Sequence, residues 1–295
     1  MAGLLARVKS KLFISSTLRS AHPLDGGYAS LVRGRSLDFE DLRPYEAADE
    51  VRDIDWRATA RAGEPMVRRS NAERRHTVLF VVDSGSGMRA LARDEHAKKD
   101  LALLVVGALA TLAVRHGDDV VLLHSDGGRA RRFESRRSEG GIELMLRALD
   151  AAIDAAEVPA PRDELLRAVA RTFARRMIVV LVTDEAPISA EGERELRRLR
   201  VQHDLVWLTL RDADPVLAVR SPGVRRDAST GWAVPEFLHG SAEVVAELQA
   251  QRAEADLRRA GLLDPLAITH ATLDGQDTAV AALLRMLHRR AAHAR

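Results

Sequence analysis

The pattern of apolar and polar positions changes near residue 77. From there to the C-terminus, short apolar runs alternate with longer amphipathic stretches, which is typical of strands alternating with helices. Strands are expected at Val78–Val82, Val120–His124, Met177–Val182, Leu205–Leu210 and Leu266–Thr269. Helices are expected at Asp94–Arg115, Ile142–Ile153, Asp163–Arg176, Glu191–Arg200, Ser241–Ala260 and Gln276–His293.

One further strand is expected at Arg129–Phe133, because the turn residues Gly127-Gly128 would fold it back beside the preceding strand. The stretch from Asp212 to Gly240 is rich in Pro, Gly and charge, and a short hairpin fits there. The pattern therefore predicts an α/β fold: a doubly wound, mostly parallel sheet with one antiparallel edge strand.

The segment before residue 77 lacks such clean periods. It opens with a short amphipathic helix over residues 1–13 and continues with a densely charged stretch, Gly34–Arg69. We expect residues 1–76 to form an arm packed on a main domain of residues 77–295. Trp56 is the expected hydrophobic anchor, with ion pairs from its charged neighbours fixing the arm; a solvated charged loop is the alternative.

The longest apolar run, Leu101–Val114, is too short to cross a membrane. A helix of this length spans about 21 Å, against roughly 30 Å of hydrocarbon. It is expected to be a buried core helix, so no membrane span is predicted. The chain has no cysteine, and its first residues lack the long apolar core of a secretory signal. We therefore expect a cytoplasmic protein.

Charge and composition argue against a nucleic-acid binder. The 295 residues include 45 basic and 43 acidic side chains, and only 4% of residues are aromatic. A protein that reads nucleic acid usually has a net basic surface and aromatic side chains for stacking. The basic runs are interleaved with acids, which favours solvated faces or protein-docking patches.

Two aspartates directly follow apolar strands. Asp83 ends the first expected strand and Asp184 follows Thr183 at the end of another, so both are expected at the same edge of the sheet. Two carboxylates with nearby hydroxyl groups suit Mg²⁺. Each aspartate alone is better explained as a turn or helix-cap residue, and only the two together favour a shared site.

The strand, the loop Asp83–Met88 and the later Thr183-Asp184 resemble the metal-ion-dependent adhesion site of von Willebrand factor A domains. In that family an Asp, two Ser, a Thr and a second Asp hold the metal ion. The resemblance gives Asp83 the first position and Asp184 the last, over a match of roughly residues 77–293.

The two serine positions of that pattern fall on Gly85 and Gly87, and Ser84 and Ser86 are out of register by one. The resemblance thus implies a degenerate metal site of Asp83, Ser86 and Asp184, with Mg²⁺ as the only cofactor suggested. A binding loop of Ser84, Gly85, Gly87 and Thr183 surrounds it. The middle threonine has no clear counterpart; Ser135 and Ser138, before Gly140-Gly141, are weak candidates for it.

The arm is similar to the signature of the domain-of-unknown-function family numbered 58. Members of that family carry such an arm just before a von Willebrand A-like domain. The resemblance is carried by Gly34–Tyr45, Asp49–Trp56, Ala60-Arg61 and Val67-Arg68, with Ala47-Ala48 where the family usually has Pro-Gly. The residues assigned to the arm motif are Arg43, Asp49, Arg52, Asp55, Trp56, Arg61 and Arg68.

The resemblance implies a non-enzymatic protein-interaction module that acts with a MoxR-type AAA+ ATPase in the assembly or maturation of protein complexes. The sequence shows no G-x-S-x-G elbow, H-E-x-x-H helix or P-loop. Two alternatives remain open from the residues: a metal-dependent hydrolase using Asp83 and Asp184, and a nucleic-acid-binding protein.

Overall fold

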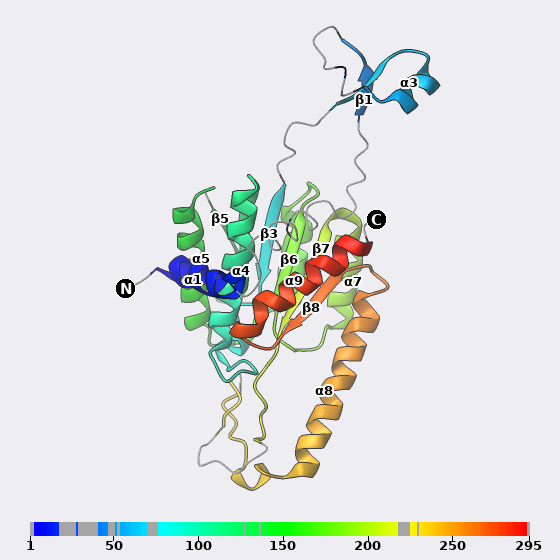
Figure 1. Ribbon diagram of the computed structural model, residues 1–295. Coiled ribbons are helices and arrows are strands. Elements are labelled where there is room, and N and C mark those ends of the chain that lie inside the picture. Colours follow the sequence, from blue (N-terminus) through cyan, green and yellow to red (C-terminus); the bar gives the residue numbers. More distant parts are fainter. Residues whose placement is uncertain are drawn as a thin grey trace.

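The computed structural model describes residues 3–17, 28, 41–46, 51, 54–69, 76–126, 128–135, 137–217, 225–228 and 230–293. A six-stranded sheet in the order β5-β4-β3-β6-β7-β8 forms the centre of the main domain (Figure 1). Its strands are β3 (Thr77–Val82), β4 (Asp119–Asp126), β5 (Arg129–Ser135), β6 (Ile178–Thr183), β7 (Asp204–Leu210) and β8 (Thr269–Leu273).

All neighbouring strands of this sheet pair in parallel except β4 and β5. The predicted fold class, a mostly parallel α/β sheet with one antiparallel edge strand, is therefore confirmed. The strand order reverses at β3, because the chain moves from β3 to β4 and β5 on one side and then to β6 on the other. Ligands bind in the crevice at such a switch point in open α/β sheets.

Helices cover both faces of the sheet, and β3 shows how the sequence divides between them. Val78, Phe80 and Val82 pack with one set of helices, whereas Leu79 and Val81 pack with the other. The first set is α1 (Leu4–Thr17), α4 (Lys98–Arg115), α5 (Glu139–Asp154) and α9 (Gln276–His293). The second includes α6 (Arg162–Thr172) and α7 (Ala190–Gln202).

Some predicted helix and strand boundaries are wrong. The helix expected to reach Arg176 ends at Thr172, and the opening helix expected over residues 1–13 covers Leu4–Thr17. Two further errors have clear local reasons. The helix expected from Asp94 starts at Lys98, because the Asp94 side chain accepts a hydrogen bond from the N–H of His96 and residues 91–97 close a turn instead. The last strand begins at Thr269 rather than Leu266, because Ala267 has a φ of 49° and interrupts the extended backbone.

A long segment separates β7 from α8 (Ala242–Leu263). The predicted hairpin is represented by a bridge between Arg226 and Ala233, followed by the short 3-10 helix η3 (Glu236–Leu238). Ser241 caps α8 by accepting a hydrogen bond from the N–H of Val244, as predicted. None of the helices in the described part of the chain is long and apolar enough to span a membrane.

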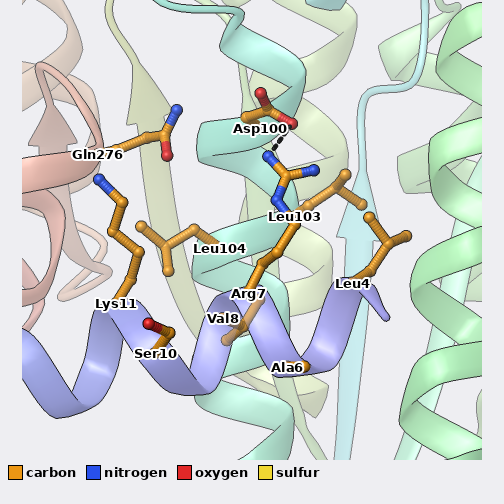
Figure 2. A pocket seen from close by; sticks show the side chains of 10 residues that line it. All are labelled: Leu4, Ala6, Arg7, Val8, Ser10, Lys11, Asp100, Leu103, Leu104 and Gln276. Carbon is orange, nitrogen blue, oxygen red and sulfur yellow. Dashed lines mark ion pairs between the residues drawn. The ribbon is translucent and has the colours of Figure 1, made fainter. Parts of the chain in front are cut away.

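The opening helix α1 lies across α4 and α5. The Glu143 carboxylate of α5 accepts hydrogen bonds from the backbone N–H groups of Leu4 and Leu5, at 3.2 and 2.7 Å. This interaction satisfies donors that the first turn of a helix otherwise leaves free. Figure 2 shows Arg7 of α1 reaching Asp100 of α4, above a cavity of about 360 Å³ between these helices.

Among the described residues of the arm, Tyr28 is the buried aromatic side chain. Its side chain is fully buried, and its ring stacks on His116 at a centroid distance of 5.0 Å. Trp56, in contrast, is 67% exposed, so the prediction that it is the hydrophobic anchor is wrong. It begins the helix α3, where Asp55 accepts hydrogen bonds from the N–H groups of Arg57 and Ala58 and fixes Trp56 at the exposed first turn.

The helix α3 (Trp56–Ala62) belongs to a small unit with the antiparallel strands β1 (Asp41–Pro44) and β2 (Met66–Arg69). Within this unit the N–H of Asp55 donates to the carbonyl of Met66, and the hydroxyl of Thr59 accepts from the N–H of Met66. The described part of the charged stretch therefore has regular local structure. The packing of this unit against the six-stranded sheet, and the domain boundary at residue 76, stay predictions.

Candidate functional site

The structure brings Asp83 and Asp184 together at the switch point of the sheet. The two aspartates follow β3 and β6, which are parallel neighbours paired from Val78–Ile178 to Val82–Val182. The N–H of Asp83 donates to the carbonyl of Val182 at 2.9 Å, which extends the pairing by one step. The expected convergence of the two carboxylates is thus found at the carboxyl ends of two central strands.

Arg162 joins these carboxylates. Its Nη2 lies 2.5 Å from Oδ1 of Asp184 and 3.5 Å from Oδ2 of Asp83. Its Nη1 donates to the carbonyl of Ala186 at 2.8 Å, and the guanidinium lies over the ring of Trp207, 5.8 Å from the centroid. Charge-assisted hydrogen bonds of this kind are stronger than neutral ones.

No sequence signal identified Arg162. It is one of many arginines in the chain, and it lies at the first residue of α6, directly after the break formed by Pro159 and Pro161. Its role depends on where the segment before α6 crosses the end of β3. A strand-and-helix pattern does not encode that crossing.

Gly85 lets this segment approach the loop after β3. A Cβ atom on Gly85 would lie 2.0 Å from the backbone nitrogen of Ala160, closer than any side chain permits. The N–H of Ser86 donates to the carbonyl of Val158 at 2.9 Å, which holds the two segments together. Glycine at this position is therefore required by a backbone that fills the space of a side chain.

The other residues predicted to form the metal site and its binding loop have different roles in the structure. Ser84 is structural: its hydroxyl donates to the carbonyl of Ser125 and accepts from the N–H of the same residue. Ser86 is buried, and its Oγ has no hydrogen-bond partner among the described residues. Thr183 is buried and donates to the carbonyl of Asp184, while Gly87 lies at the cavity described below.

Neither serine considered for the missing threonine reaches the site. Ser135 pairs with Val120 at the start of β4. This is the end of the sheet opposite to the end at which Asp83 and Asp184 lie. Ser138 caps α5 by accepting a hydrogen bond from the N–H of Gly141.

Asp83 is the more deeply placed of the two carboxylates, with 6% of its surface exposed. Burial raises the pKa of the Asp83 carboxyl group, and the charge of Asp184 raises it further. Arg162 and the N–H of Gly85 act in the opposite direction without cancelling the rise. The site therefore holds a carboxyl group whose ionisation is disfavoured.

These residues do not fit the predicted metal site. Mg²⁺ takes six oxygen ligands at 2.0–2.1 Å, several of them usually waters, and it needs free carboxylate oxygens from the protein. Asp83 and Asp184 are already bridged by a guanidinium, and the two serine positions carry no side-chain oxygen. Among the described residues there is no group of three or more His, Cys, Asp or Glu side chains suited to a metal ion.

A cavity of about 390 Å³ opens beside the bridged carboxylates. Asp83, Gly87 and Asp184 lie along its wall together with the segment before α6. Charged side chains of α6 and α7 surround it in pairs, such as Arg167 with Glu191 at 3.0 Å. Asp163 accepts a hydrogen bond from the hydroxyl of Ser189 at 2.8 Å.

The arm motif is described only in part. Asp49 and Arg52 lie outside the described residues, and only the backbone positions of Arg43 in β1 and Arg68 in β2 are described. Arg61 is exposed in the last turn of α3, where its Nε donates to the carbonyl of Arg57. Asp55 caps α3, as described above.

Fold and site together define an α/β protein with an arginine-bridged carboxylate pair at the switch point of its sheet. The chain belongs to the family described as "Protein of unknown function DUF58", which matches residues 41–234. The predicted family membership is thereby confirmed.

Two mycobacterial proteins are similar in sequence. They are uncharacterized protein Rv1480 of Mycobacterium tuberculosis and uncharacterized protein Mb1516 of Mycobacterium bovis. Each is 29% identical to this chain over 218 residues, which cover 72% of this chain and 67% of the relative.

Two solved structures resemble parts of the chain at low similarity. The conserved hypothetical protein BatB from Bacteroides thetaiotaomicron has a TM-score of 0.46 at 13% identity, covering 74% of this chain and 99% of that one. An aerotolerance-related membrane protein from Bacteroides fragilis has a TM-score of 0.44 at 15% identity, covering 72% and 99%.

Proposed function

We propose that this chain is a cytoplasmic, non-enzymatic protein-interaction module with a von Willebrand A-like domain, and that it serves as an adaptor of a MoxR-type AAA+ ATPase. The observation that carries the proposal is the charged cavity at the switch point of the sheet, beside Asp83, Asp184 and Arg162. This is where open α/β folds bind their ligands.

The chemistry of the cavity supports binding rather than catalysis. Among the described residues of the wall, the one hydroxyl side chain is that of Ser189. It caps α7 by accepting a hydrogen bond from the N–H of Gly192 and donates to Asp163, so both of its interactions are explained by the start of the helix. The carboxylates that a hydrolase would use, Asp83 and Asp184, are engaged by Arg162.

The partner assignment follows from the family resemblance and is tested with purified proteins. The MoxR-type ATPase of the same genome is immobilised, and binding of the full chain is measured by biolayer interferometry with ATP, with ADP and without nucleotide. We expect saturable binding of wild type that is weakened at least tenfold in an Asp83→Ala/Asp184→Ala variant.

A matched variant removes two exposed carboxylates away from the cavity, Glu243→Ala/Glu247→Ala on α8, and is expected to bind like wild type. Circular dichroism and thermal melting of each variant establish that it is folded. No binding of folded wild type in any nucleotide state contradicts the ATPase assignment. Equal binding by the Asp83→Ala/Asp184→Ala variant contradicts the assignment of the cavity.

A further inference from the structure

The guanidinium of Arg162 is held on several sides within the site. Its Nη2 reaches both carboxylates, its Nη1 donates to a backbone carbonyl, and one face of the group lies over Trp207. Only 11% of the side chain is exposed. Such a side chain is a fixed part of the site rather than a solvated surface charge.

The segment that carries Arg162 also fills the neighbouring space. Ala160 lies against Gly85, where the resemblance to the adhesion site would place the first serine. Arg89, from the turn after the loop, donates to the carbonyl of Ala156 at 3.1 Å. The backbone of Ala160 therefore fills the space of a hydroxyl ligand. The side chain of Arg162 brings a positive charge to the same part of the site.

We propose that Arg162 is the resident cation of this site, that it closes the site to divalent metal ions, and that its removal turns the Asp83–Asp184 pair into a divalent-cation site. A metal ion shared by Asp83 and Asp184 would have to occupy the space between their oxygens, where Nη2 of Arg162 already lies 2.5 Å from one and 3.5 Å from the other. The like charge of the guanidinium opposes it as well.

A guanidinium is a permanent cation in proteins, whereas burial readily shifts the pKa of a lysine ammonium group. An arginine is therefore suited to the role of a resident cation at this position.

The test compares wild type with Arg162→Ala and with the double variant Arg162→Ala/Asp184→Asn. Thermal melting is recorded in EDTA and in 5 mM MgCl₂ or MnCl₂, and Mn²⁺ binding is measured directly by electron paramagnetic resonance. Arg171→Ala is the matched control, because Arg171 lies on the same helix and its side chain is 69% exposed.

We expect wild type and Arg171→Ala to bind no Mn²⁺ and to show the same Tm with and without metal. Arg162→Ala is expected to melt lower in EDTA, to bind Mn²⁺, and to regain about 2–4 °C in its presence. The double variant, which keeps one carboxylate, is expected to lose that gain.

Mn²⁺ binding by wild type that is lost in Asp83→Asn overturns the proposal, because the site would then accept a metal ion with Arg162 in place. Failure of folded Arg162→Ala to bind Mn²⁺ overturns the claim that removal of Arg162 creates a divalent-cation site. If Arg162→Ala does not fold, Arg162→Gln replaces it, and the wild-type measurement still decides whether the site is closed. None of these outcomes depends on ATPase binding, so they are distinct from a failure of the proposed function.

Discussion

The hydroxyl of Tyr28 donates a hydrogen bond of 2.7 Å to Oδ2 of Asp118, 90 residues further along the chain. Oδ1 of the same carboxylate accepts from the N–H of His76, directly before β3. One buried carboxylate thus joins the arm, the start of the central strand and the turn after α4. Tyr28 is held at this point to the end of the sheet opposite the candidate site.

Replacing Tyr28 with Phe is expected to lower the free energy of unfolding by about 1–3 kcal/mol at pH 7, because Asp118 loses a buried donor. Urea denaturation measures the change. Trp56→Phe is the control and is expected to stay within about 0.5 kcal/mol of wild type, because Trp56 is exposed. A larger effect of Trp56→Phe would restore Trp56 as the anchor.

The loss of stability caused by Tyr28→Phe should depend on pH. Burial raises the pKa of Asp118, but hydrogen bonds from His76 and Tyr28 outweigh this effect and the pKa lies below its ordinary value. A lowered native pKa contributes stability that is present above the unfolded value of about 3.9 and lost as pH falls through the native pKa. The difference between wild type and Tyr28→Phe should therefore shrink below pH 4; a constant difference would contradict this assignment.

Asp83→Asn tests a carboxyl group whose native pKa is raised rather than lowered. Because burial and Asp184 raise the native pKa of Asp83, its stabilising contribution is complete below the unfolded value of about 3.9 and is lost as pH rises through the native pKa. Asparagine does not ionise. The stability of Asp83→Asn relative to wild type should therefore increase with pH above about 4, in urea denaturation series of both proteins. A relative stability that falls across this window would show that Arg162 dominates the pKa of Asp83.

Removing the guanidinium should be costly. Arg162→Met leaves two neighbouring carboxylates, one of them buried, without their cation, and is expected to cost about 3–5 kcal/mol at pH 7. Arg171→Met removes an exposed partner that lies 3.8 Å from Glu164 and should cost less than about 1 kcal/mol. Similar losses for the two variants would mean that the bridge contributes no more than a surface ion pair.

Gly85→Ala tests the close approach of the segment before α6. Its methyl group would collide with the backbone of Ala160, and the expected loss is about 1–3 kcal/mol or more. Gly140→Ala, in the first turn of α5, meets nothing within 4 Å and is expected to be neutral or slightly stabilising. Thermal melting of the two variants separates these outcomes, and an unchanged Tm for Gly85→Ala would contradict the contact.

The strands of the main sheet were predictable because their signal is local. Val78–Val82 is an uninterrupted apolar run ending at an aspartate, and parallel pairing brings such ends together. Arg162 was not predictable in this way. Its partners lie 79 and 22 residues away, and its position depends on the path of a Pro-rich connection.

In the arm, the exposure of Trp56 and the burial of Tyr28 were likewise not predictable from the local sequence. Trp56 is large and apolar, which favours burial in any sequence-based interpretation. Its exposure follows from its place at the start of a short helix capped by Asp55. Tyr28, surrounded in the sequence by residues without clear periodicity, is buried because a carboxylate far along the chain receives its hydroxyl.

The position of Trp207 beneath Arg162 supplies an optical probe of the site. The chain has three tryptophans, of which Trp207 is buried and Trp56 and Trp232 are exposed. Conversion of the two exposed indoles to phenylalanine would leave a single emitter in contact with the bridging guanidinium. Its fluorescence would then report, without any attached label, each event that moves Arg162 from its carboxylates.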